Sequence, residues 1–429
     1  MSILDAQLPS EWTWKQVADL YWITKKPRNI HFADHEAIPF VPMELVPTNG
    51  KEYVSFEMRA PAQIASGTYF EKGDILLSKI TPSFENGKQG LANSIAVPFG
   101  VASTEVIPLQ RLTPEVNSRL LFYYLLHPEV RESIAGKMEG STGRQRVPER
   151  VVLEYPVPNP PKEEQDKIAA VLWKIQRAIE VEEKLTATAR ELKQAAMRQL
   201  FTRGLRGEAQ QETEIGSIPE SWEVVQLGSC ARIGNGTTPN RQHAAYWQGG
   251  NIPWITSGRM YERRISGSET HVTQTALDEC SLPLLQPGAI LMAIVGQGKT
   301  LGHCAVLDSV ATVSRHVGFI QLHDKNISPE FVRYYLEGQY EYLRQLAAGN
   351  GSTRAALTSA ILRSFSIPLP KPQEQNEIVA ILNATVSKIS LHERKQAALQ
   401  DLFKTMLHQL MTGEIRVADL EIDTSEVTA

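Results

Sequence analysis

The chain has 429 residues, of which 42% are hydrophobic and 21% are charged, as is typical of a globular protein with two or three domains. No apolar run approaches the roughly 18 residues that span a bilayer, no secretory signal is evident, and three scattered cysteines are too few for a disulfide framework, so we expect a cytoplasmic protein with no membrane partner. The net charge of −4 argues mildly against a lone nucleic-acid-binding protein, because such proteins are usually basic.

Short β-type runs, broken by glycine, proline and asparagine, fill the first part of the chain. Strands are expected over residues 74–77 and 94–97, and a short helix over residues 117–126. This mixture predicts a compact α+β domain, to which we assign residues 1–158.

A long helix is predicted next, over residues 159–205. Glycine and proline are absent for some forty residues after Pro160-Pro161, and proline is well tolerated just before a helix. Apolar residues recur with alternating spacings of three and four, the pattern of a coiled-coil seam. The expected seam comprises Ile168, Val171, Ile175, Ala178, Leu185, Ala189, Leu192 and Ala196.

The same order of elements follows in the second half. Strands are expected over residues 289–295 and 316–320 and a helix over residues 329–346, within a second domain at 206–369. A second long helix is predicted over 370–413, before a tail at 414–429. Its expected seam comprises Ile378, Ile381, Leu399, Leu402 and Met406.

The two halves are a tandem duplication with an offset of about 210 residues. Three pairs of strings carry this interpretation: Pro9-Ser-Glu-Trp12 with Pro219-Glu-Ser-Trp222, Glu164-Gln165 with Glu374-Gln375, and Gly140-Ser-Thr-Gly-Arg144 with Gly351-Ser-Thr-Arg354. Neither long helix can bury its seam alone, so we expect the two to pair. Antiparallel pairing would relate the two domains by a pseudo-twofold axis.

A polar residue interrupts each seam near its midpoint: Glu182 in the first helix and His392 in the second, again 210 residues apart. In an antiparallel pair midpoint faces midpoint, so we expect these side chains to meet and set the register of the helices. The alternative is that both face solvent.

Three strings imitate catalytic motifs without completing them. Asn159-Pro-Pro-Lys162 resembles an adenine-methyltransferase string but has lysine in place of the aromatic residue, and it fits a helix entry. Gly296-Gln-Gly-Lys-Thr300 lacks the first glycine of a P-loop, although a Gly-Lys loop suits contact with DNA phosphate. Metal-ligand spacing is missing from three scattered histidines, His303, His316 and His323, so we expect no metal site.

The duplicated plan resembles the specificity subunits of type I restriction-modification enzymes. The residues that carry the resemblance are the two junctions, 157–168 and 367–378, together with Pro219-Glu-Ser-Trp222, Gly236-Thr-Thr-Pro239, residues 295–300 and Ser103-Thr-Glu105. The resemblance covers nearly the whole chain, and the strings occur in order.

This resemblance implies two target-recognition domains, each reading one half of a split double-stranded DNA sequence, separated by helices that set the gap. It also implies no catalytic centre and no cofactor in this chain. Two methyltransferase (modification) subunits would carry S-adenosylmethionine, and translocating restriction subunits would carry the ATP and Mg²⁺ sites. Partner-facing acidic surface would then explain the net charge.

Residues that can reach groove edges or phosphates are the DNA-binding candidates, since arginine and lysine suit guanine or phosphate and asparagine and glutamine suit adenine. Positions shared by both halves favour phosphate contact, because the halves should read different bases. Ordinary solvated surface is the alternative for each. The candidates are Lys79, Asn86, Lys88, Gln89, Arg144, Arg146, Arg241, Gln242, Arg259, Gln297, Lys299 and Arg354.

Two other classes of function stay open at this point. A methyltransferase or nuclease subunit would need a cofactor loop and an acid/base cluster, and neither is evident. A coiled-coil scaffold with two modules that do not bind DNA would show no DNA affinity even with its partners present.

Overall fold

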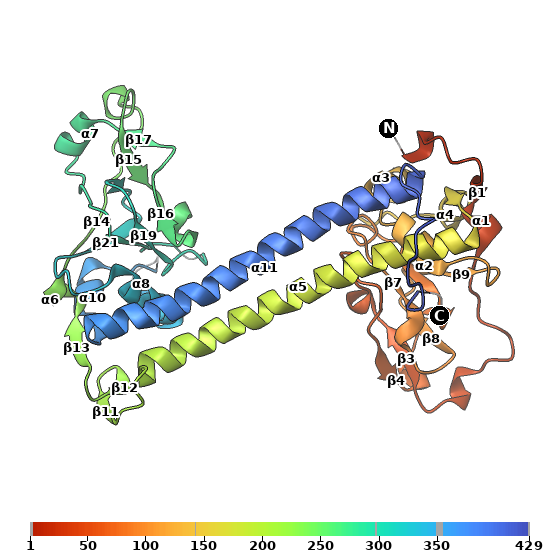
Figure 1. Ribbon diagram of the computed structural model, residues 1–429, viewed down its shortest axis with the longest axis horizontal. Helices are drawn as coiled ribbons and strands as arrows, with labels where there is room; N and C mark the ends of the chain where they lie inside the picture. The colour runs from red at the N-terminus through yellow and green to blue at the C-terminus, as the bar shows by residue number, and fades with distance from the viewer. Residues whose placement is uncertain (1–2, 142, 297, 349–354, 428–429) are drawn as a thin grey trace. The chain divides into compact units, whose positions relative to one another are not determined.

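The computed structural model describes residues 3–141, 143–296, 298–348 and 355–427 (Figure 1). The chain forms two compact units, one of residues 1–185 and 392–429 and the other of residues 186–391. These units differ from the sequence repeats because each contains half of both long helices, α5 (Lys162–Arg203) and α11 (Pro372–Thr412). Within the described residues, none of the helices combines the length and apolar character needed to cross a bilayer.

The first unit is a mixed α+β domain built on two four-stranded sheets, in the orders β2-β9-β6-β7 and β4-β3-β8-β5. A two-stranded ladder, β1 with β10, joins the start of the domain to its end. Its elements are β1 Thr13–Gln16, α1 Val17–Leu20, β2 Tyr21–Ile23, β3 Ile38–Val41, β4 Glu57–Arg59, β5 Thr68–Glu71, β6 Ile75–Ser78, β7 Gln89–Leu91, β8 Phe99–Ala102, β9 Val106–Arg111, α2 Ser118–Tyr124, α3 Pro128–Ala135, α4 Glu149–Leu153 and β10 Pro156–Asn159.

The second unit has a five-stranded sheet, β14-β21-β18-β19-β16, and a three-stranded sheet, β17-β15-β20. Its elements are β11 Gln210–Thr213, β12 Gly216–Pro219, β13 Glu223–Gln226, α6 Leu227–Cys230, β14 Ala231–Asn235, β15 Ile252–Ile255, β16 Arg264–Ile265, β17 His271–Val272, α7 Gln274–Glu279, β18 Ile290–Ala293, β19 Cys304–Leu307, β20 Thr312–Val313, β21 Val317–Leu322, α8 Pro329–Gly338, α9 Tyr340–Ala348, α10 Ser359–Ser364 and β22 Ser366–Leu369.

The two units share a strand order, as expected for a tandem duplication. The run β2-β9-β6-β7 of the first unit has its counterpart in β14-β21-β18-β19 of the second. Each unit also contains a parallel pair at the equivalent place, β3 with β8 and β15 with β20. The closing ladders match as well, since Thr13 pairs with Asn159 and Glu223 pairs with Leu369.

One predicted strand, over residues 94–97, is wrong. Residues 92–94 form a short 3-10 helix, and the chain runs irregularly from there to β8. The Ser94 hydroxyl donates to the Val54 carbonyl at 2.6 Å, and Ile95 alone of this run is buried in the core, from a loop. A short apolar run does not by itself distinguish a strand from a buried loop.

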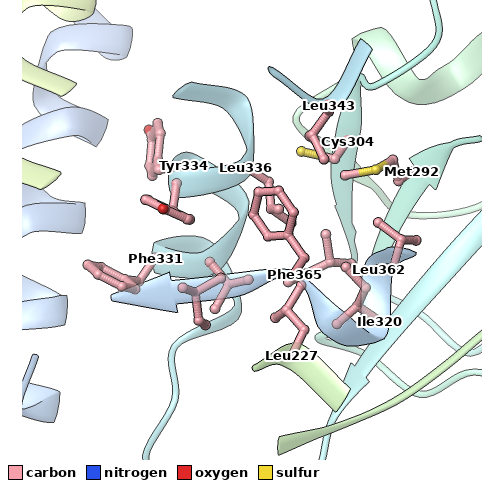
Figure 2. Close-up of a cluster of buried hydrophobic side chains, with 14 of the residues drawn as sticks. Leu227, Met292, Cys304, Ile320, Phe331, Tyr334, Leu336, Leu343, Leu362 and Phe365 are labelled. Atoms are coloured by element: carbon pink, nitrogen blue, oxygen red, sulfur yellow. The ribbon is translucent and has the colours of Figure 1, made fainter. Parts of the chain in front are cut away.

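A single apolar cluster forms the main core of the second unit, and Figure 2 shows its centre. Leucine and phenylalanine side chains of helices α8, α9 and α10 pack on the inner face of β18, β19 and β21. The cluster also includes Met197 and Leu200 of α5 with Ile378 and Leu382 of α11, so both helices help to close the domain. Labelled in Figure 2 are Leu227, Met292, Cys304, Ile320, Phe331, Tyr334, Leu336, Leu343, Leu362 and Phe365.

In the first unit, the halves of α5 and α11 run antiparallel. Near its start α5 places Leu172 in the same core as Leu407 of α11, and further along α5 Glu182 contacts His392. Residue numbers therefore increase along α5 while those of the neighbouring residues on α11 decrease, as in an antiparallel pair.

The apolar seam of each helix is displaced by about one residue from its predicted position in the middle of the helix. Leu185 is 42% exposed and Leu192 is 61% exposed, whereas Thr186 is buried. On α11, Leu402 is 45% exposed while Phe403 packs against the first core. A straight α-helix has 3.6 residues per turn, whereas alternating spacings of three and four average 3.5 residues. A seam predicted from that pattern therefore shifts away from the buried face over forty residues.

Glu182 and His392 lie in hydrogen-bond contact, with 2.5 Å between Glu182 Oε2 and His392 Nδ1. Their side chains are 14% and 20% exposed, so the pair is largely shielded from water. Lys395 approaches the other oxygen of Glu182 at 3.9 Å and is itself 53% exposed.

We expect a double-mutant cycle with Glu182→Gln and His392→Gln to give a coupling free energy of about 0.5–1.5 kcal/mol, because the contact is short and shielded. Urea unfolding of the four chains would measure it. The matched control is the cycle of Glu182→Gln with Lys395→Gln, for which we expect less than about 0.5 kcal/mol, since that longer pair is solvated. Equal coupling in the two cycles would contradict a role of His392 in setting the register.

Each domain is fastened to its long helix by a buried tryptophan and a buried glutamate. Trp12 Nε1 donates to Glu164 Oε2 at 2.8 Å, and Trp222 Nε1 donates to Glu374 Oε2 at 3.2 Å. In the first unit Arg416, beyond the end of α11, also donates to both oxygens of Glu164, at 2.7 and 2.8 Å. The repeated Pro-x-x-Trp and Glu-Gln strings therefore attach each domain to the start of a long helix, and we call each Trp–Glu contact a lock.

Candidate nucleic-acid interface

In the first domain, two segments far apart in sequence come together beside the end of β6. The loop after β6 (residues 79–88) pairs with residues 145–147, through a bridge between Ile80 and Arg146. The Thr81 amide donates to the Gln145 carbonyl at 3.0 Å, and the Val147 amide donates to the Lys79 carbonyl at 2.8 Å. Four predicted DNA-binding residues therefore lie in or next to these two segments: Lys79, Asn86, Arg144 and Arg146.

Exposure divides the predicted residues of this domain into two groups. Asn86, Arg144 and Arg146 are exposed, and Lys79 is half-buried. Lys88 points inward instead, and its Nζ donates to the Met43 carbonyl at 2.7 Å. Gln89 is 1% exposed, so its predicted contact with DNA is not compatible with this fold.

Gln89 has a structural role, which explains its burial. Its Nε2 donates to the Phe122 carbonyl at 2.5 Å, and its Oε1 accepts from Arg131 at 2.6 Å. A buried amide needs such partners, because an unpaired one costs about 1–3 kcal/mol. The sequence alone does not distinguish a glutamine that hydrogen-bonds buried polar groups from one that contacts adenine.

Arg131 of α3 is hydrogen-bonded to the loop of residues 79–88 from the interior of the domain. It is 7% exposed and donates to the Phe84 and Leu125 carbonyls, both at 2.5 Å. Burial lowers the pKa of its guanidinium to about 10, which still leaves it charged at neutral pH. The loop therefore has a rigid base, as a surface that recognises shape requires.

Arg146 forms a two-pronged ion pair with Glu105, with 2.8 Å from Nε to Oε2 and 2.6 Å from NH2 to Oε1. The hydrogen bond from Arg146 is the largest cause of the lowered pKa of the Glu105 carboxyl. Glu105 lies in the turn between β8 and β9. The Ser103-Thr-Glu105 string gives no sign of this contact in the sequence, because the partner is 41 residues away.

The second domain repeats the arrangement around the loop after β18. Val295 forms an isolated bridge with Ala356, as Ile80 does with Arg146. From α9, Tyr340 donates to the Lys299 carbonyl at 2.6 Å, and Arg344 donates to the Gly298 carbonyl at 2.8 Å. The Lys299 side chain is exposed. Two predicted residues of this surface, Gln297 and Arg354, lie outside the described residues.

The remaining predicted residues of the second domain do not gather on this loop. Arg241 and Gln242 are exposed in the segment after β14, where the Arg241 guanidinium lies 5.8 and 5.7 Å from the ring centroids of Trp247 and Trp254. Arg259 is held by Glu262, at 2.5 and 2.6 Å, and is partly buried. Arg259 is thus engaged within the protein.

Three aromatic side chains that are not among the predicted DNA-binding residues lie beside the Lys299 loop. The imidazole of His303 lies between two tyrosine rings, 4.6 Å from that of Tyr261 and 4.8 Å from that of Tyr340. Tyr261 is 57% exposed, and its hydroxyl lies 3.0 Å from the Thr300 hydroxyl. No periodic signal links these residues, which come from three separate elements.

The strings that imitate catalytic motifs have structural explanations. Asn159 ends β10, and its Oδ1 accepts from Gln165 Nε2 at 3.2 Å, so this string forms the entry to α5. The Gly296–Thr300 segment leads into β19. Across the part of the chain that the structure describes, no group of three or more histidine, cysteine or acidic side chains is placed to hold a metal ion.

A protein-family model described as "Type I restriction modification DNA specificity domain" matches the chain twice, over residues 9–191 and 219–401. The chain is 24% identical over 330 residues to the type I restriction enzyme MjaVIII specificity subunit of Methanocaldococcus jannaschii, covering 75% of this chain and 76% of that one. It is 32% identical over 203 residues to the MjaIX specificity subunit of the same organism, covering 45% of each chain.

Solved structures show the same fold at low sequence identity. The S subunit of a type I restriction-modification system from M. genitalium superposes with a TM-score of 0.56 at 15% identity, over 95% of this chain and 96% of that one. A chain from a structure of type I restriction-modification complex assembly gives 0.60 at 18% identity, over 95% and 100%. With two family matches that together cover most of its length, this chain belongs to the DNA-specificity subunits of type I restriction-modification systems, the non-catalytic part of these enzymes, with two target-recognition domains.

Proposed function

We propose that this chain reads a two-part double-stranded DNA sequence, one half with residues 1–158 and the other with residues 206–369. Residues 159–205 and 370–413 form the helices that set the unread gap, and residues 414–429 are a tail. One observation carries the proposal: the two domains share a backbone plan but present different polar side chains beside β6 and β18.

The chemistry would reside on the partners. Two modification subunits would bind S-adenosylmethionine and methylate adenine, and restriction subunits would supply the ATP- and Mg²⁺-dependent translocation and cleavage. Support comes from the family match and from the relatives, whose names identify them as subunits of restriction enzymes. Such a complex would work in the cytoplasm, where the DNA is.

Contacts of two kinds would hold the DNA. Lys79, Asn86, Arg144 and Lys299 are available for phosphates and groove edges, since none of them is fully buried. Arg241 and Gln242 offer a second contact region in the second domain. Phosphate contacts fix the position of a protein on the duplex, and contacts to base edges provide the sequence information.

The test is a methylome. The chain would be expressed with the methyltransferase subunit encoded beside it in a host without adenine methylation, and the DNA sequenced by a method that detects modified adenine. We expect a two-part motif with a fixed gap, present only when this chain is present. If both proteins are soluble and associated but no motif appears, the proposal is wrong, and a scaffold function takes its place.

A further inference from the structure

A tight turn in the first domain carries Thr104 and Glu105 between β8 and β9. Its backbone is held at three points: the Ser103 amide donates to the Val41 carbonyl at 2.9 Å, the Val106 amide to the Ser103 carbonyl at 3.2 Å, and the Lys79 amide to the Glu105 carbonyl at 2.9 Å. The turn is thereby fixed to β3 and to the loop after β6.

The second domain builds the same turn between β20 and β21. The Ser314 amide donates to the Ile255 carbonyl at 2.9 Å, the Val317 amide to the Ser314 carbonyl at 3.0 Å, and the Ile294 amide to the His316 carbonyl at 3.1 Å. Glu105 and His316 therefore occupy equivalent positions, 211 residues apart.

On this shared backbone the first residue is serine in both domains, Ser103 and Ser314, but the two residues that follow it differ. The first domain presents Glu105 with Arg146, and the second presents His316 with Arg315, whose Nε donates to His316 Nε2 at 3.3 Å. At the bridge position that holds Arg146 in the first domain, the second domain has Ala356. Arg146, Arg315 and His316 are exposed.

We propose that these two turns are base-reading sites, with Arg146 as the reader in the first domain and the Arg315–His316 pair as the reader in the second. The inference rests on the proposed function and assigns its specificity-determining residues. A conserved frame with divergent exposed side chains is what two domains need if they dock on DNA alike but read different bases.

The geometry of the ion pair indicates which base Arg146 reads. Glu105 accepts one hydrogen bond from Nε and one from NH2, and the Arg144 carbonyl accepts from NH1 at 3.3 Å. A guanidinium has five N–H groups, so donors remain on its outer edge. Two parallel donors held in one plane match O6 and N7 of guanine, so Glu105 is a positioning residue for a guanine reader.

The experiment is the same methylome, repeated with single variants of the full chain. Arg146→Gln is expected to reduce discrimination at one guanine of one half-site by about 10- to 100-fold, since a bidentate base contact has about that effect. The other half-site and the gap should stay unchanged. Glu105→Gln should weaken discrimination at the same base pair, and Arg315→Gln should act on the other half-site only.

Arg150→Gln is the matched control, because Arg150 also pairs with a glutamate, Glu139, but with 70% and 62% of the two side chains exposed. Glu139 is bridged to Arg146 through its backbone, which this substitution does not alter. It should leave the motif unchanged. Residual methylation at the intact half-site, and association with the methyltransferase subunit, would show that a variant is folded.

The outcomes separate the two proposals. No motif with the unaltered chain means that the proposed function fails. A motif that stays unchanged in Arg146→Gln and in Arg315→Gln overturns the base-reading sites while leaving the proposed function standing, and so does a uniform loss of methylation across both half-sites without a change in sequence preference.

Discussion

Replacing Arg119 by methionine is expected to lower the free energy of unfolding of the first domain by about 3–5 kcal/mol, because the change leaves a buried carboxylate without its cation. The Arg119 and Glu52 side chains are only 5% and 2% exposed, and Arg119 Nε lies 3.2 and 3.1 Å from the two carboxylate oxygens. Tyr123 also donates to Glu52, at 2.5 Å.

The loss should depend on pH in a defined direction. Burial raises the pKa of Glu52 above its ordinary value even with Arg119 in place, and removing Arg119 raises that pKa further. A raised folded-state pKa means that the protonated side chain is tolerated at low pH and that stability is lost as the pH rises through that pKa. Arg119→Met should therefore be most destabilised at neutral and higher pH.

Urea unfolding of the full chain at pH 5 and pH 8, with hydrogen exchange to assign the loss to the first domain, would measure this effect. Arg111→Met is the matched control, since Arg111 lies in the same domain but is exposed, and it should change stability by less than about 0.5 kcal/mol. Adding Glu52→Leu to Arg119→Met should restore much of the loss. Failure of that double variant to recover would show that the packing of Arg119, rather than its charge, stabilises the domain.

Replacing Glu164 by leucine is expected to lower the free energy of unfolding by about 2–4 kcal/mol and to release the segment after α11. Glu164 is 2% exposed and accepts from Trp12 and Arg416. The expected loss is smaller than for Arg119→Met because the Arg416 side chain is 32% exposed and is solvated by water when its contact with Glu164 is lost.

Acid should remove the same interaction. Burial alone would raise the pKa of Glu164, but hydrogen bonds from Arg416 and Trp12 outweigh burial and lower it from 4.5. A lowered folded-state pKa gives stability that is present above the unfolded value and is lost as the pH falls through the folded one. The difference between Glu164→Leu and the unaltered chain should therefore be full at pH 7 and shrink below about pH 4.

Thermal unfolding of the purified chain and hydrogen exchange over residues 414–427 would measure both effects. Glu163→Leu makes the same substitution one residue earlier, on a side chain that is 81% exposed, and should change little. Equal losses in the two variants would show that the lock between Trp12 and Glu164 does not stabilise the domain.

Local chemistry and repetition made much of the fold predictable from the sequence. A forty-residue stretch without glycine or proline indicates a long helix, and helices are observed over Lys162–Arg203 and Pro372–Thr412. The recurrence of Trp12 as Trp222 and of Glu164 as Glu374 indicates a duplication, because a repeated string requires only comparison of the chain with itself. The family follows from the same strings.

The sequence could not separate residues that face DNA from residues that satisfy the core. Gln89 and Asn86 are equally plausible readers of adenine by type, yet the first is buried and the second is exposed. The spacing of apolar residues likewise did not identify which of them are buried, since Leu185 and Leu192 have the spacing of a seam but are exposed. Burial depends on which neighbour covers a position, and that neighbour is distant in the chain.

What the sequence determined by itself was therefore the repeated plan and the two long helices, because these depend on composition, periodicity and self-similarity along the chain. The family was indicated by the resemblance of the junction strings to those of known specificity subunits. Only the tertiary structure decided the interface. Glu105 and Arg146 meet because the β8–β9 turn and the segment after α3 are both hydrogen-bonded to the loop after β6. The equivalence of Glu105 with His316 likewise appears in the shared backbone hydrogen bonds, since the matching serines Ser103 and Ser314 are too short a string to reveal it in the sequence.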